Sequence, residues 1–107
     1  MKKYEVIIQE SAELDLNGII EYIAIDLNEK SIALKLYKKI VEAINSLTDT
    51  PGRCAIIDED PYKTLQTRRL IIDNYSIFYY LNNETETVHI LRVLYNRRDW
   101  KNLLITQ

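Results

Sequence analysis

The sequence of 107 residues is poor in the residue types that mark several classes of protein, with one cysteine, one histidine, two glycines and two prolines. The single cysteine, Cys54, excludes an internal disulfide and a thiolate cluster for zinc. There is no glycine-rich phosphate loop and no histidine or cysteine cluster, so we expect neither a metal nor a cofactor. No apolar run approaches the roughly 18 residues of a membrane-spanning helix. We therefore expect a single domain, residues 1–107, in the reducing cytoplasm, with no membrane partner.

The sequence also lacks an excess of positive charge, because its formal net charge is −2 at pH 7. Proteins that coat nucleic acid through bulk electrostatics are usually basic, which disfavours that class. The charge is uneven: residues 1–30 carry three lysines and seven carboxylates, whereas residues 61–107 carry seven cations and four carboxylates. The C-terminal part is expected to face any anionic surface that the protein meets, unless these cations are ordinary solvated side chains.

Periodic apolar residues are abundant in the first half of the chain. The segment of residues 3–9 is short and rich in β-branched and aromatic side chains, which favours a strand. Ser11 and Ser31 are each expected to cap an amphipathic helix, the first reaching Leu27 and the second Leu47. Gly18 lowers the helix propensity of the first by about 1 kcal/mol relative to alanine, and either a close contact or simple tolerance would account for it.

After the turn at residues 50–52 the apolar period changes from helical spacing to two. Residues 54–57 are predicted as a weak strand, and residues 65–72, 75–81 and 87–94 as an antiparallel meander joined by polar turns. In the last of these, alternation places Val88, Ile90, Arg92 and Leu94 on one face and His89, Leu91 and Val93 on the other. A short C-terminal helix is expected over residues 99–104.

These elements predict an α+β fold in the order β-α-α-β-β-β, with two N-terminal amphipathic helices packed on an antiparallel sheet and a short C-terminal helix. The helices cover one face of the sheet and leave the other open. Register decides which side chains lie there, and the sequence does not fix the register. The open face is expected to hold one of each of three pairs: Arg68 or Arg69, Tyr79 or Tyr80, and Arg92 or His89.

Three features are candidates for chemistry or binding. Histidine transfers protons most readily near neutral pH, so His89 is a candidate acid or base, the alternative being a half-buried sheet residue. Tyrosines at positions 75, 79 and 80 of one strand could stack on bases, or could simply pack. Arg97 and Arg98 follow a predicted strand directly and suit bidentate contact with phosphate or carboxylate, unless they pair internally with Asp99 or the acidic first helix.

The order and spacing of several segments make the chain similar to the RelE/ParE superfamily of small bacterial toxins from type II toxin–antitoxin modules. These segments are residues 4–16, 19–23, 69–71, 75–79 and 90–100. The resemblance implies two helices on a curved antiparallel sheet, and a growth-inhibiting protein of the kind linked to plasmid stabilisation. It also implies a cognate antitoxin encoded beside it, whose apolar anchors enter an amphipathic groove between helices and sheet.

The superfamily has two branches with different targets. RelE-like members cleave mRNA in the ribosomal A site, whereas ParE-like members inhibit DNA gyrase. Aligned on residues 75–79, the lysine pair of the RelE branch falls on Thr67 and Arg69 and its mid-strand arginine on Ser76, so two of three cations are missing. If the chain is a metal-independent endoribonuclease, the resemblance implies Arg69, Tyr95 and Arg98 as catalytic residues, with Tyr95 replacing a tyrosine expected where Leu104 stands.

The missing cations and the net charge of −2 favour the ParE-like branch and a protein that is not an enzyme. The hypothesis is an inhibitor that binds DNA gyrase with Arg97, Arg98 and Trp100 as anchors, because tryptophan and arginine dominate binding hot spots. Trp100 could instead close the end of the core. The alternatives are a ribosome-dependent mRNA endoribonuclease and a relative that has lost toxicity.

Overall fold

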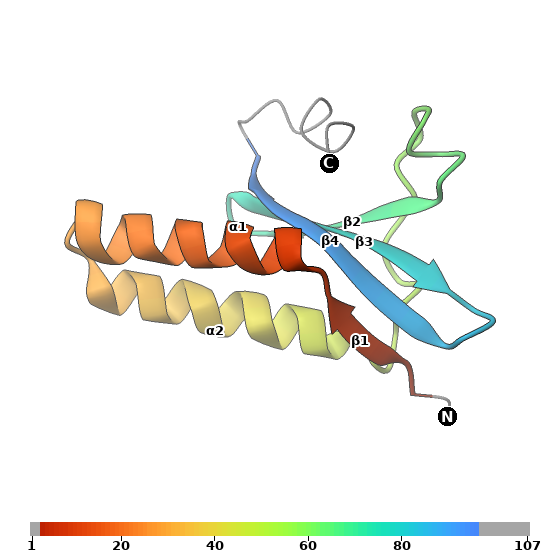
Figure 1. Cartoon of the computed structure of the whole chain (residues 1–107), viewed down its shortest axis with the longest axis horizontal. Helices are drawn as coiled ribbons and strands as arrows, with labels where there is room; N and C mark the ends of the chain where they lie inside the picture. Colours follow the sequence, from red (N-terminus) through yellow and green to blue (C-terminus); the bar gives the residue numbers. More distant parts are fainter. Residues whose placement is uncertain (1–2, 97–107) are drawn as a thin grey trace.

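Two helices pack on one side of a four-stranded sheet (Figure 1). The computed structural model describes residues 3–96, so the helix predicted for residues 99–104, together with Arg97, Arg98 and Trp100, lies outside the described residues. The α+β fold class predicted from the sequence is confirmed. Within residues 3–96, no helix is both long enough and apolar enough to cross a membrane.

The helical layer is a hairpin of two helices, as the apolar spacing predicts. The first helix ends in a short stretch of wider π-helix, after which the chain turns at Asn28 with a positive φ of 54°. The bounds are α1 Glu10–Glu21, η1 Tyr22–Asp26 and α2 Lys30–Ser46. Apolar residues at three- and four-residue spacing are buried along one side of each helix: Ala12, Leu16, Ile23, Ala33, Leu36, Ile40 and Ile44.

The sheet has the strand order β1-β4-β3-β2. The bounds are β1 Glu5–Ile8, β2 Thr67–Ile72, β3 Tyr75–Asn82 and β4 Thr87–Tyr95. Strands β2, β3 and β4 form the predicted antiparallel meander. Strand β1 pairs with β4 in parallel, so the sheet is mixed rather than wholly antiparallel. The composition of a strand does not encode its direction, and the long helical connection after β1 permits a parallel neighbour.

The weak strand predicted for residues 54–57 is wrong. Ile56 forms one isolated bridge with Arg68, and the N–H of Ile57 donates to the backbone oxygen of Thr67 at 2.9 Å. This segment therefore follows β2 over its first residues without becoming a strand.

Both predicted serine caps are also wrong. Ser11 and Ser31 lie inside the first turns, because the helices begin one residue earlier, at Glu10 and Lys30. The Ser11 hydroxyl instead donates to the backbone oxygen of Leu91 in β4 at 2.8 Å. A capping serine must stand just outside the helix, so a tertiary contact has replaced the local one here.

The core lies between the two helices and the sheet. Side chains from both layers are fully buried and contribute about 1.5–3 kcal/mol each to folding. They include Ile40, Leu47, Ile77, Val88 and Ile90. Tyr79 also lies in this core, where its hydroxyl donates to the backbone oxygen of Pro51 at 2.7 Å and so keeps a buried polar atom satisfied.

A β-bulge in β4 changes which residues face the helices. Phe78 of β3 pairs with Arg92, but the next residue, Tyr79, pairs with Ile90, so β4 has one extra residue at this point. An extra residue reverses the alternation beyond it. The predicted faces of this strand are therefore wrong: Val93 joins Val88 and Ile90 in the core, while Arg92 and Leu94 lie on the opposite face with His89.

Candidate functional site

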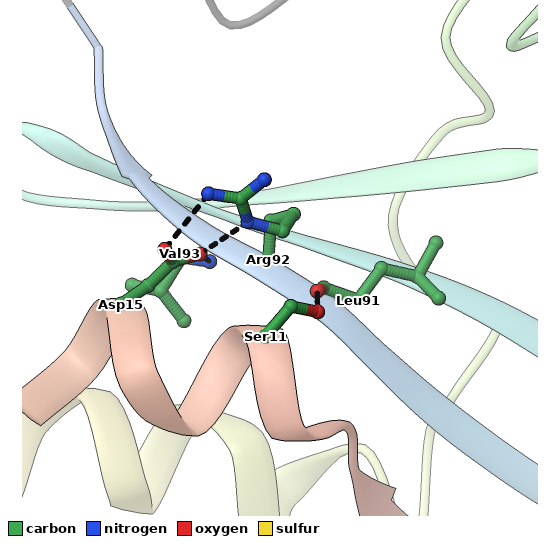
Figure 2. A network of polar contacts seen from close by, with 5 residues as sticks. All are labelled: Ser11, Asp15, Leu91, Arg92 and Val93. Carbon is green, nitrogen blue, oxygen red and sulfur yellow. Dashed lines mark hydrogen bonds and ion pairs between the residues drawn. The ribbon is translucent and has the colours of Figure 1, made fainter. Parts of the chain in front are cut away.

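Helix α1 takes the place of a strand along part of the β4 edge. Strand β1 covers this edge up to Ile90, whose backbone oxygen accepts from the N–H of Gln9 at 3.0 Å. Beyond it, Ser11 Oγ donates to Leu91 O, and the N–H of Val93 donates to Asp15 Oδ2 at 3.1 Å. Figure 2 shows both side chains reaching β4 from neighbouring turns of α1. Helix side chains thus pair with backbone groups of β4 beyond the last residue that β1 contacts.

Asp15 also forms a bidentate ion pair with Arg92. Arg92 Nε donates to Asp15 Oδ2 at 2.6 Å and Nη2 to Oδ1 at 2.9 Å, and the two side chains are 17% and 14% exposed. The hydrogen bond to Asp15 raises the pKa of Arg92, against the opposing effect of burial. Figure 2 places the pair where α1 meets β4. Sequence reasoning missed Asp15, because its partner lies 77 residues away and nothing local distinguishes it from a solvated carboxylate.

A second polar cluster lies on the sheet face away from the helices, at the end of β4. Arg69 Nε donates to Ser76 Oγ at 2.8 Å and its Nη2 to Asn96 Oδ1 at 3.4 Å. The Ser76 hydroxyl also donates to Asn96 Oδ1. The Arg69 guanidinium lies 5.9 Å from the centroid of the Phe78 ring. The last described residue, Asn96, is thereby held directly before Arg97.

The structure does not bring together two of the residues implied for a ribonuclease. Tyr95 pairs with Tyr75 across β3 and β4 on the helix side of the sheet, with ring centroids 5.5 Å apart. Arg69 pairs with Phe78 on the opposite face. The sheet therefore separates Arg69 from Tyr95, while the third member, Arg98, lies outside the described residues.

An apolar groove of about 840 Å³ lies between the helices and the sheet. Its large hydrophobic side chains are well exposed at Leu14 (64%) and Ile32 (52%). Burial in this region raises the pKa of Tyr75, with smaller contributions from Tyr95 and Tyr22. The aromatic and aliphatic residues that line the groove are Leu14, Ile19, Tyr22, Ile23, Leu27, Ile32, Tyr75, Val93, Leu94 and Tyr95.

The open face contains one member or both of each pair left undecided by the sequence. Arg69 lies there and Arg68 does not, because Arg68 pairs with the core residue Tyr79. Tyr80 lies there beside His89, its cross-strand partner, with ring centroids 6.1 Å apart. Because of the bulge, both His89 and Arg92 are on this face.

His89 is engaged through both ring nitrogens. Gln9 Nε2 lies 3.3 Å from Nδ1, and Thr87 Oγ1 lies 3.0 Å from Nε2. The arrangement that satisfies both contacts has Gln9 donating to Nδ1 and the Nε2–H donating to Thr87. These bonds fix the ring and support the interpretation of His89 as a sheet residue rather than a proton-transfer group.

The chain matches the family described as the ParE toxin of the type II toxin–antitoxin system, parDE, over residues 6–100. Among curated proteins, no match was found. Among solved structures, the chain is similar to one from the chromosomal ParDE toxin–antitoxin system of P. aeruginosa. That similarity has a TM-score of 0.71 and 21% identity, and covers 87% of this chain and 96% of that one.

Two further structures are similar in fold. One belongs to the RelBE2 toxin–antitoxin complex of Mycobacterium tuberculosis, with a TM-score of 0.66, 23% identity, and coverage of 89% and 93% of the two chains. The other is from the archaeal RelE–RelB complex of Pyrococcus horikoshii OT3, with a TM-score of 0.53, 15% identity, and coverage of 90% and 98%. Because the family match spans most of the sequence, the chain belongs to the ParE toxin family and is a toxin of a type II toxin–antitoxin system.

Proposed function

We propose that this toxin inhibits DNA gyrase by binding it, without cutting nucleic acid, and that a cognate antitoxin neutralises it in the cytoplasm. The observation that carries this proposal is the separation of Arg69 and Tyr95 onto opposite faces of the sheet. RNA cleavage without a metal needs a base, an acid and cations around one phosphate. Residues that are separated by a sheet do not meet around one phosphate.

The neutral side chains beside Arg69 support the same reading. Thr67 and Ser76 lie on its face of the sheet, at the positions where the RelE branch carries two of its cations. Arg69 itself donates to Ser76 and Asn96, which gives it a role in holding the end of β4. A single guanidinium held in this way supplies little of the charge that a phosphorane requires.

The end of β4 is held in place by hydrogen bonds, which favours binding through the residues that follow it. The backbone N–H of Asn96 donates to Asn74 O at 2.8 Å, and the Asp15–Arg92 pair fixes the strand to α1. We propose Arg97, Arg98 and Trp100 as the anchors that contact gyrase. Anchors that leave a rigid strand lose less conformational freedom when they bind.

The antitoxin is the second partner that we propose. The similar structures come from ParDE and RelBE toxin–antitoxin systems, which makes an antitoxin the expected partner here. The apolar groove beside α1 and η1 offers exposed Leu14, Tyr22 and Ile32 to its side chains. An amphipathic antitoxin segment would bury these residues.

The decisive experiment expresses the chain in a bacterial host that lacks the antitoxin and compares plasmid supercoiling with mRNA 5′ ends. Loss of negative supercoiling with intact transcripts is the expected result. Codon-phased mRNA cleavage would instead establish the RelE-like ribonuclease, and normal growth with confirmed soluble protein would indicate a non-toxic relative.

The anchors are tested in the same host by the double substitution Arg97→Ala and Arg98→Ala. Toxicity should be lost while the protein stays folded. Lys35→Ala with Lys38→Ala is the matched control, since it removes two positive charges from exposed positions of α2 and should leave toxicity unchanged. Persistent toxicity of the arginine variant would refute this assignment.

A further inference from the structure

A second, smaller pocket of about 370 Å³ adjoins the apolar groove beside the first half of α2. The linings of the two hollows share Ile23, Ile32 and Tyr75, so a peptide segment that lies in the groove can also reach the pocket. The pocket differs from the groove in its charge, because its lining adds Lys35 and Lys39 of α2. Among the described residues, no lysine or arginine lines the groove itself.

The two lysines leave the pocket with an excess of positive charge. They are four residues apart, which places them one turn apart on the same side of α2. Lys39 has a carboxylate partner, since its Nζ lies 3.2 Å from Asp73 Oδ2. The Lys35 ammonium forms no hydrogen bond or ion pair with any residue from 3 to 96. Two ammonium groups therefore share one carboxylate among the described residues of this lining.

This lining suits a carboxylate that is carried on an apolar segment. The floor of the pocket is apolar and largely buried, with Ile23 8% and Leu36 7% exposed. An ion pair formed above such a floor is stronger than one in open water, because the local dielectric constant is lower. A carboxylate would accept hydrogen bonds from the Lys35 ammonium, whereas a lysine or arginine side chain would be repelled.

Negative charge lies on the other side of Ile32. Glu29 lines the groove and not the pocket, and Lys35 follows it by six residues, which is about 9 Å along the axis of a helix. A segment bound beside α2 therefore meets a carboxylate, an apolar side chain and an ammonium group in turn. Complementary charges set the register and direction of a bound partner more than they add to its affinity.

We infer that the Lys35 pocket receives an aspartate or glutamate side chain of the antitoxin, from the same segment whose apolar side chains occupy the groove. This ion pair fixes the direction in which the segment lies along α2. The inference rests on the proposed binding of the antitoxin in the groove, and it names the chemistry by which the groove selects its partner. It does not depend on the proposed binding of gyrase.

The pocket is tested with two variants that change the charge equally. Lys35→Glu and Lys38→Glu both replace an exposed lysine of α2, but Lys35 lines the pocket and Lys38 does not. In calorimetry with the co-encoded antitoxin, we expect the Kd to rise at least tenfold for Lys35→Glu and less than about twofold for Lys38→Glu. Equal rises would overturn the inference, because they would reflect net charge alone.

A double-mutant cycle identifies the carboxylate on the antitoxin. Each aspartate of the antitoxin is replaced by asparagine and each glutamate by glutamine, one at a time, and binding to the wild type and to Lys35→Ala is compared. One replacement should weaken binding to the wild type and have little further effect on Lys35→Ala. The inference would be refuted if every replacement had the same effect on both chains.

Ile32→Asp separates failure of this inference from failure of the proposed groove. If Ile32→Asp weakens antitoxin binding while Lys35→Glu behaves like Lys38→Glu, the antitoxin lies in the groove without a carboxylate in the pocket, and the inference alone fails. If Ile32→Asp leaves binding unchanged, the antitoxin lies elsewhere and both fail. Weakening by Ile32→Asp and by Lys35→Glu, but not by Lys38→Glu, is the result expected if both are correct.

Discussion

The Asp15 carboxylate accepts hydrogen bonds from Arg92 Nε, Arg92 Nη2 and the N–H of Val93. One side chain of α1 thus holds both a cation and a backbone group of β4. Because the ion pair is mostly buried, neither partner is solvated well when the other is removed. Asp15 is therefore the residue whose loss should most affect the position of the β4 end.

We predict that Asp15→Ala lowers the free energy of unfolding by about 3 kcal/mol, since it leaves the Arg92 charge buried without its carboxylate. Urea denaturation of the purified chain measures this change. Lys39→Ala is the control, because the Lys39–Asp73 pair is 59% and 48% exposed and should contribute less than about 1 kcal/mol. Equal losses in the two variants would show that the Asp15 pair does not stabilise the fold.

The raised pKa of Tyr75 predicts that the stability of the fold decreases at alkaline pH. Burial raises its pKa in the folded chain, whereas the unfolded side chain ionises near its ordinary value of 10.0. The folded state then holds the proton more tightly, so its stability falls as the pH rises above that value. Tyr75→Phe removes this contribution, and its urea midpoint should fall less than that of the wild type between roughly pH 9 and 11. An equal fall would contradict the prediction.

At the scale of elements, apolar spacing predicted both helices and three of the four strands of the sheet as a meander. It failed at the bulge, because one extra residue in β4 exchanges the faces of Arg92 and Val93 without any change in composition. It also failed at Ser11, where a contact with Leu91 replaced a cap. The Ser11 contact joins residues 80 positions apart, and the bulge is a register shift between β3 and β4, so the pattern within one segment contains neither.

Gly18 in α1 is explained by tolerance rather than by a close contact. A Cβ atom built on Gly18 meets nothing within 4 Å, and the residue lines the apolar groove. Gly18→Ala should therefore raise the free energy of unfolding by about 0.5–1 kcal/mol through higher helix propensity. Thermal or urea unfolding checks this, and a loss of stability would mean that the helix needs glycine there.

If the antitoxin binds in the groove, substitutions at two nearby positions at the start of α2 should have very different effects on antitoxin binding. Ile32 lines the groove and is 52% exposed, whereas Leu34 is 55% exposed and is absent from its lining. Ile32→Asp should reduce antitoxin binding by more than about tenfold, because a charge would be buried in the interface. Leu34→Asp should bind normally. Calorimetry with the co-encoded antitoxin measures both, and equal effects would place the antitoxin elsewhere.

At the scale of the whole molecule, the predicted two-layer arrangement is confirmed. The prediction of a wholly antiparallel sheet is wrong, because β1 is parallel to β4. The family resemblance also implied the groove between helices and sheet, but it grouped Arg69 with Tyr95, which lie on opposite faces. Grouping by family position ignores the face on which each residue emerges, and that depends on the register and the bulge. The groove and Arg69 therefore lie on opposite sides of the sheet.

The proposed inhibition of gyrase by binding can be measured directly with purified components. Purified gyrase, relaxed plasmid and ATP are combined with increasing amounts of the chain, and the supercoiled product is measured on a gel. We expect the wild-type chain to abolish supercoiling at concentrations near that of gyrase, and the Arg97→Ala, Arg98→Ala variant to leave supercoiling unchanged. Full supercoiling in the presence of a large excess of folded wild-type chain would contradict it.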